Sequence, residues 1–246
     1  MLEGLRTAAA GMVAMQQKLD GVANDLANAN TTGYKHVRIG FKDLLYEQTG
    51  RPGANGVERG TGSAAVQAGR SFEQGAFKTT GQPLDVAIAG EGFLKVKLPD
   101  GRQALTRDGD LQIDGKGRIE TATGSLIQPT ITVPQGITED QISIGRDGTV
   151  LAAGKQIGKL QLVTVRSSAG LLPTGDSNSF VTTAASGPAR PAPAASTLQQ
   201  GVLEGSNTDM AQAMVDMIDA QRTYQLTSKA IQTADTMMEI ANGVKR

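Results

Sequence analysis

The side chains that most often carry out chemistry in proteins are scarce in this sequence of 246 residues. It has no cysteine, which excludes thiol nucleophiles, disulfides and cysteine-ligated zinc. It has one histidine, His36, so a catalytic triad or a histidine-rich metal site would depend on that residue alone. Because His36 lies between Lys35 and Val37 in a basic stretch, we interpret it as a surface or interface histidine.

Asp108, Asp110 and Asp114 have a spacing that resembles the start of a calcium-binding loop. An EF-hand that begins at Asp108 needs an Asp or Asn at position 112 and a glycine at position 113, where this chain has Gln112 and Ile113. Asp-Gly hairpin turns explain these aspartates more simply.

Glycine-rich segments resemble phosphate-binding loops without matching their spacing. Five residues separate Gly109 from Gly115 and Gly148 from Gly154, whereas such a loop has four. The 24 basic and 24 acidic residues balance, which argues against a protein that binds phosphate backbones. We predict no cofactor, no metal site and no nucleic-acid partner, although any two acidic residues could still pair as catalytic carboxylates.

Apolar residues recur every seven positions at both ends of the chain, which predicts two helices that pack along a narrow seam. In the N-terminal segment the a and d positions are Leu5, Met12, Leu19 and Leu26 with Ala8, Met15, Val22 and Ala29. Near the C-terminus they are Met210, Met217, Tyr224, Ile231 and Met238 with Ala213, Ala220, Thr227, Ala234 and Ala241. Ordinary amphipathic helices that fold onto a core are the alternative.

Three glycines weaken the first helix. Gly4, Gly11 and Gly21 each cost about 1 kcal/mol relative to alanine. A helix with such losses does not persist alone in water. We therefore expect the seam to include both termini and other copies of the chain.

Polar residues mark where these helices begin and end. Ser206 followed by Asp209 fits a capping box, which predicts that the second helix starts near residue 207. Asn24 and Asn28 lie one turn apart on the same flank of the seam, and Gly33 is typical of a left-handed cap. We expect these last three residues to shape the exit from the first helix.

The middle of the chain has the pattern of an antiparallel β domain. Asp-Gly pairs, which are typical of tight hairpins, occur at 100–101, 108–109, 114–115 and 147–148. The glycine-rich residues 48–69 and the alanine- and proline-rich residues 184–197 have the composition of loose linkers.

We therefore predict an α+β fold, with an antiparallel β-rich central domain and long N- and C-terminal coiled-coil helices. The helical domain comprises 1–33 and 206–246, extended linker or β connections comprise 34–80 and 184–205, and the outer β-rich domain comprises 81–183. The N-terminal segment lacks the leucine-rich stretch of a secretory signal, and no run approaches about 18 apolar residues. We expect neither a cleaved signal peptide nor a membrane-spanning helix.

The segment from Ala23 to Lys35 resembles the N-terminal signature of a known family. It matches the pattern A-N-N-L-A-N-x-x-T-x-G-[FY]-K, with Asp25 where asparagine is common. The likeness continues in the same order through Phe41–Tyr46, Arg51–Ala54, Leu84–Phe93, Thr106–Gly109, Glu204–Asp209, Met217–Ile218, Gln221–Tyr224 and Ser228–Ile231. On these residues the chain is identified as a member of the axial protein family of the bacterial flagellum, which comprises rod and hook proteins.

Within this family the chain most resembles the distal rod proteins, because Asp-Leu-Leu-Tyr at 43–46 is followed by Arg-Pro-Gly-Ala at 51–54. The stretch Glu47–Gly62 is shorter than the insert usual at this place in the family. The resemblance links that insert to a straight, stiff tube. The resemblance implies a structural subunit, not an enzyme, that self-assembles into the helical tube of the flagellar basal-body rod and transmits torque from motor to hook. The alternatives are a hook, proximal rod or paralogous hook–basal body protein, a rod-associated cell-wall hydrolase, or a soluble β-domain binding module.

The resemblance also implies partners and a location. The partners are other copies of the chain, other rod subunits, hook protein and the flagellar export apparatus, with ring proteins of the envelope as further candidates. It implies type III export beyond the cytoplasmic membrane without a cleaved signal peptide. Both terminal helices then belong to an inner coiled-coil layer whose subunit-interface residues are Leu5, Met12, Leu19, Leu26, Asn24, Asn28, Gly33, Met217, Tyr224 and Ile231.

Overall fold

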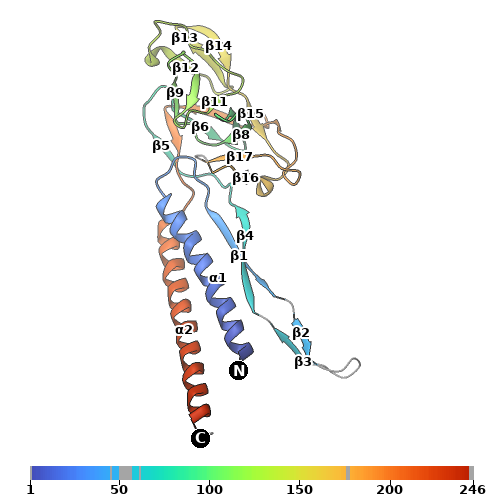
Figure 1. Cartoon of the computed structure of the whole chain (residues 1–246). Coiled ribbons are helices and arrows are strands. Elements are labelled where there is room, and N and C mark those ends of the chain that lie inside the picture. Colours follow the sequence, from blue (N-terminus) through green and yellow to red (C-terminus); the bar gives the residue numbers. More distant parts are fainter. Residues whose placement is uncertain (1, 45, 50–56, 61, 176–177, 244–246) are drawn as a thin grey trace. The chain divides into compact units, whose positions relative to one another are not determined.

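Figure 1 shows a computed structural model of the chain, in which residues 2–44, 46–49, 57–60, 62–175 and 178–243 are described. The chain divides into two compact units. The first contains Met1–Ala27, Val37–Gly69 and Asp209–Arg246, and the second contains Asn28–His36 and Arg70–Thr208. The first unit therefore joins the two ends of the chain, and the second holds most of its middle.

Two helices dominate the first unit: α1 (Leu2–Ala27) and α2 (Met210–Gly243). They lie side by side and run in opposite directions, so the start of α1 and the end of α2 lie at the same end of the pair (Figure 1). The α+β class, with a helix at each end of a β-rich middle, is thereby confirmed.

The capping residue of α2 is Asp209, not Ser206. Its Oδ1 accepts hydrogen bonds from the backbone N–H groups two and three residues ahead, at 2.9 and 3.2 Å, which is the arrangement of an N-cap. Ser206 Oγ instead accepts from the N–H of Thr208, before the helix. The predicted start near residue 207 is therefore wrong by one helical turn, because both residues are good caps and only the contacts distinguish them.

Strand pairs accompany the helices in the first unit: β1 (Val37–Asp43) pairs with β4 (Ser63–Arg70), and β2 (Tyr46–Thr49) pairs with β3 (Val57–Gly60). The prediction of a loose stretch at 48–69 is wrong for its described residues, which lie largely in these strands. The Arg51–Ala54 segment of the family resemblance lies outside the described residues. Strand β1 contacts α1, where a Cβ at Gly21 would come within 2.2 Å of Ile39 Cδ1. Gly21 weakens an isolated helix, yet here it lets the strand approach.

The second unit is β-rich and antiparallel, as predicted. Along its largest sheet the strands follow the order β16 (Leu172–Pro173), β17 (Ser179–Val181), β8 (Gln103–Thr106), β7 (Phe93–Lys97), β11 (Leu126–Ile127), β10 (Ile119–Thr121) and β9 (Leu111–Ile113). Strand β15 (Leu162–Thr164) also pairs with β7, and β18 (Arg190–Pro191) pairs with β15.

Smaller sheets complete this unit. One has the order β12 (Ile142–Ile144), β13 (Thr149–Ala152) and β14 (Lys155–Lys159). Two pairs join distant parts of the sequence, namely β6 (Val86–Ala89) with β19 (Thr197–Gln200) and β5 (Phe77–Thr79) with β20 (Val202–Glu204). Short 3₁₀ turns lie at η1 (Glu139–Gln141) and η2 (Ser168–Gly170). The last strands of the unit thus return to its first ones.

The Asp-Gly pairs have two different roles. Those at 100–101, 114–115 and 147–148 lie in hairpins that join β7 to β8, β9 to β10 and β12 to β13, as predicted. The pair at 108–109 forms no hairpin, because β8 and β9 are not neighbours in the sheet. A Cβ at Gly109 would lie 1.6 Å from the carbonyl oxygen of Val86, so this glycine permits a close backbone contact instead.

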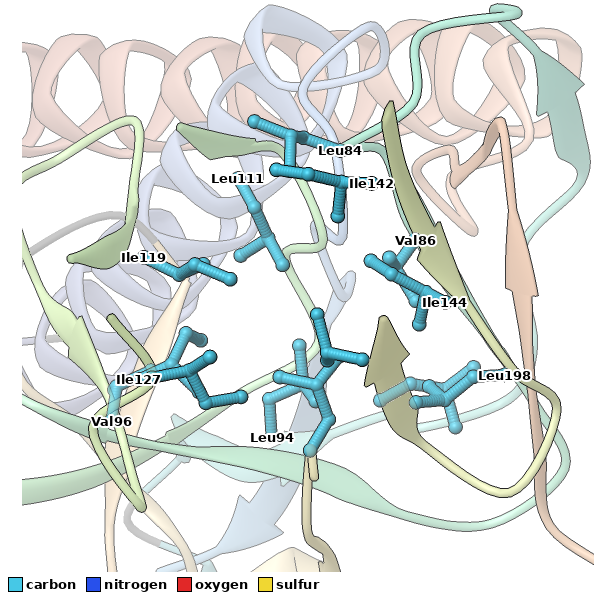
Figure 2. Packing of buried hydrophobic residues seen from close by; sticks show 14 of the residues in the cluster. Leu84, Val86, Leu94, Val96, Leu111, Ile119, Ile127, Ile142, Ile144 and Leu198 are labelled. Atoms are coloured by element: carbon cyan, nitrogen blue, oxygen red, sulfur yellow. The ribbon is translucent and has the colours of Figure 1, made fainter. Parts of the chain in front are cut away.

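Aliphatic side chains from nearly all of these strands form the core of the second unit. Figure 2 shows the labelled members turned toward one another: Leu84, Val86, Leu94, Val96, Leu111, Ile119, Ile127, Ile142, Ile144 and Leu198. Each is at most 5 % exposed. The buried residues of α2, by contrast, are the small Ala213 and Ala220. Burial of apolar area is the main source of stability, so the second unit is the better stabilised of the two.

Candidate assembly site

The seam positions predicted on the two helices lie mainly on their less exposed sides. The half-buried apolar residues among the proposed interface residues are Leu5, Met12, Leu19, Leu26, Met217 and Ile231. Tyr224 is 39 % exposed. The buried Ala213 and Ala220 also belong to the predicted seam, and small side chains there allow the helices to approach closely. The heptads therefore describe a side of each helix that is partly covered within one molecule.

The ion pair described between α1 and α2 contributes little to their pairing. Lys18 Nζ lies 3.9 Å from Asp216 Oδ1, and both side chains are about one-third exposed. An exposed ion pair of this length is worth at most about 1 kcal/mol. Apolar contact along the seam must supply most of the stabilisation.

Large apolar side chains remain exposed on the rest of α2. These residues, which we call the exposed set of α2, are Met210, Met214, Val215, Ile218, Leu226, Met237 and Ile240, each 48–69 % exposed. Met210 apart, they lie outside the heptad seam. Exposed apolar surface of this kind marks sites of protein interaction. These six do not follow the seven-residue periodicity, so the heptad pattern does not reveal them.

The three residues expected to shape the exit from α1 have different surroundings. Asn24 is exposed on the helix, and Asn28 is half-buried. Asn28 Oδ1 accepts a hydrogen bond from the Thr31 hydroxyl at 3.1 Å, and its carbonyl accepts one from the Thr31 N–H at 3.1 Å. Gly33 has a left-handed backbone, with a φ of 66°, but it follows the end of α1 at Ala27 by several residues and does not cap it.

Three charged side chains are buried together in the second unit: Lys35, Arg107 and Glu204, which we call the ionic cluster. Lys35 Nζ donates to Glu204 Oε1 at 2.7 Å and to the carbonyl oxygen of Glu73 at 2.6 Å. Arg107 Nε donates to Glu204 Oε2 at 3.0 Å, and its Nη2 donates to the carbonyl oxygen of Gly90 at 2.8 Å. The side chains are 0 %, 4 % and 0 % exposed, respectively. Each oxygen of the Glu204 carboxylate therefore has its own cation.

Backbone groups complete this cluster. Glu204 Oε1 also accepts from the N–H of Gly75 at 2.9 Å, and the Glu204 carbonyl accepts from the N–H of Gly33 at 2.8 Å. A Cβ at Gly33 would lie 2.9 Å from the backbone nitrogen of Asp108, so a side chain has no room there. Gly33 therefore allows residues 28–36 to pack closely against the backbone at Asp108 within the second unit.

The ionic cluster has no signature in the local sequence pattern. Its three residues all lie in segments that carry the family resemblance, but Lys35 and Glu204 are 169 positions apart. Nothing in local spacing pairs a lysine with one glutamate among many. The family resemblance of these three segments is the signal in the sequence that could have indicated the cluster.

Burial shifts the pKa of Lys35, Asp108 and Asp110 in this unit, and it raises the pKa of the Asp110 carboxyl. It lowers the pKa of the Lys35 ammonium, and the hydrogen bond and charge of Glu204 oppose that shift. Burial also raises the pKa of the Asp108 carboxyl to about 6, supported by the charges of Asp110 and Asp85 and opposed by a hydrogen bond from the Asp110 N–H. Glu204 is compensated by cations, whereas Asp108 has carboxylates as neighbours.

A polar hollow of about 620 Å³ lies in the second unit, lined among others by Lys78, Asp85, Asp110 and Glu139. The Thr80 hydroxyl donates a hydrogen bond to the Asp85 carboxylate. In the described part of the chain, no three His, Cys, Asp or Glu side chains gather in a way that could hold a metal ion. Among the described helices, none has the length and apolarity needed to cross a membrane.

Comparison with known proteins identifies the family. Residues 5–35 match the model of the flagella basal body rod protein, residues 87–152 match the flagellar hook protein FlgE/F/G D1 domain, and residues 199–244 match the flagellar basal body rod FlgEFG protein C-terminal region. These matches include most of α1, all of α2, part of the β-rich unit and the three residues of the ionic cluster, whereas residues 71–76 lie outside them.

The chain also resembles curated proteins over their full length. It is 42 % identical over 267 residues to the flagellar basal-body rod protein FlgG of Borreliella burgdorferi, with all of both chains covered. It is 38 % identical to FlgG of Caulobacter vibrioides, with 99 % of this chain and 100 % of the relative covered. It is 31 % identical to the rod protein FlgF of Escherichia coli over 89 % of each chain. These relatives are structural proteins of the flagellar rod and not enzymes.

With a helix at each end, a β-rich middle and this full-length similarity, the chain belongs to the family of flagellar basal-body rod proteins and is a structural subunit of the rod.

Proposed function

We propose that this rod subunit polymerises through α1 and α2 into the inner coiled-coil layer of the distal rod, a helical tube that transmits torque from motor to hook. Its partners are further copies of itself, other rod subunits, hook protein and the export apparatus, with envelope ring proteins as candidates. It has no catalytic role, and it reaches the rod by type III export without a cleaved signal peptide. Similarity to the two FlgG relatives over the full length supports a place in the rod, and the resemblance at residues 43–46 and 51–54 supports the distal position.

The exposed set of α2 carries this proposal. Apolar side chains of this size stay in water only at a cost, about 25 cal/mol per Å² of apolar surface. In a non-closing interface between identical copies, each subunit covers the exposed helix surface of the next, and a tube results. Seam residues such as Leu26 and Met217 then hold α1 to α2 while the exposed set meets neighbouring subunits.

Leu226→Asp tests this proposal. Leu226 is 69 % exposed, so the change should leave the thermal unfolding of the purified monomer unchanged. In cells that lack their own subunit, it should abolish rod assembly and motility, because a charge would be buried at the subunit contact. Leu26→Asp on the seam should also abolish assembly, and it should loosen the helix pair in the monomer as well.

Gln225→Asp is the matched control, because Gln225 is exposed on the same helix turn and is polar already. It should support normal motility. A motile strain that carries Leu226→Asp would refute assembly through the exposed set. Curvature of the assembled filaments would separate a hook protein from a rod protein. The wall hydrolase alternative is tested by replacing Asp85, Asp110 and Glu139 with amides. Motility that persists after these replacements would argue against it.

A further inference from the structure

The segment that follows α1 and the segment that precedes α2 lie side by side within the second unit. Residues 28–36 follow α1, and residues 204–208 precede α2. Asn207 binds across them, because its Oδ1 accepts from the N–H of His36 at 2.8 Å and its own N–H donates to the carbonyl of Tyr34 at 3.3 Å. Its Nδ2 donates to the carbonyl of Ser71 at 2.9 Å. A third segment, residues 71–76, therefore binds the other two.

We propose that Lys35, Arg107 and Glu204 are positioning residues for rod assembly. They fix the segment that follows α1 and the segment that precedes α2 in one register on the second unit, before the helices meet other subunits. This inference rests on the function proposed above, and it concerns the monomer rather than the contacts between subunits.

Stability alone does not account for the ionic cluster. Each buried ion loses several kcal/mol of hydration, and apolar side chains of similar volume often replace such a triad at no cost. The second unit already has a large aliphatic core. Directional bonds to charged groups provide something that the aliphatic core lacks, namely one fixed alignment of the segments that they join.

The bonds of Glu204 determine that alignment. Its carboxylate binds Lys35 in the first segment, Gly75 in the third and Arg107 after β8, and its carbonyl binds Gly33. A slip by one residue would place Leu203 or Gly205 against two buried cations. Either residue would leave those cations without a counter-charge, which costs several kcal/mol.

Close backbone packing restricts the same segments. A Cβ at Gly75 would lie 2.2 Å from the carbonyl oxygen of Gly205, and the Gly205 N–H donates to the Ala76 carbonyl at 2.8 Å. Arg70 adds a further link, because its guanidinium lies 5.4 Å from the centre of the Tyr34 ring and donates to the Lys35 carbonyl at 2.9 Å. The alignment thus depends on side-chain charge, backbone contact and ring stacking together.

Because the chain contains no cysteine, spin labels can be placed at two engineered cysteines in the full-length monomer. Asn30→Cys and Thr208→Cys place one label on each of the two segments. The distance distribution between them is measured by pulsed electron spin resonance. The variants to compare are Glu204→Gln, which removes the charge at constant shape, and the apolar triple variant Lys35→Met, Arg107→Met and Glu204→Leu. Asp147→Asn removes an exposed ion pair of the same unit and serves as the control.

We expect one narrow distribution for the wild type and the control, and one at least twice as wide for both cluster variants. The triple variant should melt within about 5 °C of the wild type, because it exchanges ionic for apolar packing. In cells it should nevertheless form at least tenfold fewer rods than the wild type. That combination of intact stability, loose segments and lost assembly is what a positioning role requires.

The inference fails if the triple variant keeps a narrow distribution, or if it assembles normally despite a wide one. It also fails if neither cluster variant folds, because the cluster would then serve the second unit alone. If the wild-type gene does not restore rods, the proposed function fails, whereas the distance measurement on the monomer still reports on the alignment.

Discussion

Buried charges in the second unit differ in how well their surroundings compensate them. Glu204 has a cation at each carboxylate oxygen, and it is fully buried. Asp108 is 8 % exposed and has the carboxylates of Asp110 and Asp85 nearby, so its ionised form is disfavoured. The family resemblance includes Asp108, yet its charge weakens the fold at neutral pH. A residue of this kind makes stability depend on pH in a predictable direction.

Asp108→Asn should stabilise the chain at pH 7. The pKa of Asp108 is raised from 3.8 to about 6, so its favourable contribution is full below pH 3.8 and is lost as the pH rises through 6. This difference corresponds to at most about 3 kcal/mol. Asparagine keeps the acceptor for the Asp110 N–H and has no charge, so the variant should gain about 1–3 kcal/mol at pH 7 and nothing at pH 3.

Urea unfolding between pH 3 and pH 8, followed by circular dichroism, measures this effect. Asp100→Asn is the control, because hydrogen bonds from Arg102 lower the pKa of that exposed carboxyl. Its removal should bring no gain at pH 7. An Asp108→Asn variant that is less stable than the wild type at pH 7 would show that the carboxylate is needed in its ionised form.

At the scale of elements, α2 combines a predictable seam with surfaces that the heptads did not reveal. Its seam alanines Ala213 and Ala220 are buried, while the exposed set, Met210 apart, lies outside the seam. A helix that is apolar on several sides has more than one neighbour to meet. One side chain, Asp209, caps two backbone N–H groups of the first turn of α2.

Asp209→Ala should destabilise the start of α2 by about 1 kcal/mol, because two backbone N–H groups lose their acceptor. Amide exchange at residues 210–213 should become roughly fivefold faster at that cost. Ser206→Ala, which alters the cap favoured by the sequence pattern, should leave these amides unchanged. Equal effects of the two changes would contradict the assignment of the cap.

At the scale of the whole molecule, the two units differ in how much apolar surface they bury. The second has an aliphatic core with each labelled member of Figure 2 at most 5 % exposed. The helix pair has half-buried seam residues and several exposed apolar ones. Local opening is easiest where few apolar contacts must break. The helices of a single subunit are therefore the first elements to open.

Hydrogen exchange on the purified monomer should show this difference directly. Amides of α1 and α2 should exchange at least a hundredfold faster than those of β6, β7 and β8, and they should become protected on assembly. Equal protection of helices and strands in the monomer would contradict this prediction, and it would favour a binding module that is complete as a single chain.

Periodicity and turn chemistry predicted what depends on neighbours in sequence. The heptads predicted both helices, and three of the four Asp-Gly pairs in the middle of the chain marked hairpins. Gly109 did not follow its turn signal, because Val86 approaches it from another strand. The ionic cluster was missed for the same reason, since its members come from three distant segments. Contacts between distant segments depend on how the strands associate, which composition does not specify.

Because 169 residues separate Lys35 from Glu204, the two residues are synthesised at different times. A chain grows from its N-terminus at about 5–20 residues per second, so Lys35 emerges roughly 10–30 s before its counter-charge exists. During most of that interval Glu73 and Arg70, which also bind this segment, are already present, and the Lys35 ammonium lacks only its counter-charge. The bond to Glu204 closes about two-thirds of the chain into a loop, and it can form only after Lys35 has met the nearer residues Arg70 and Glu73.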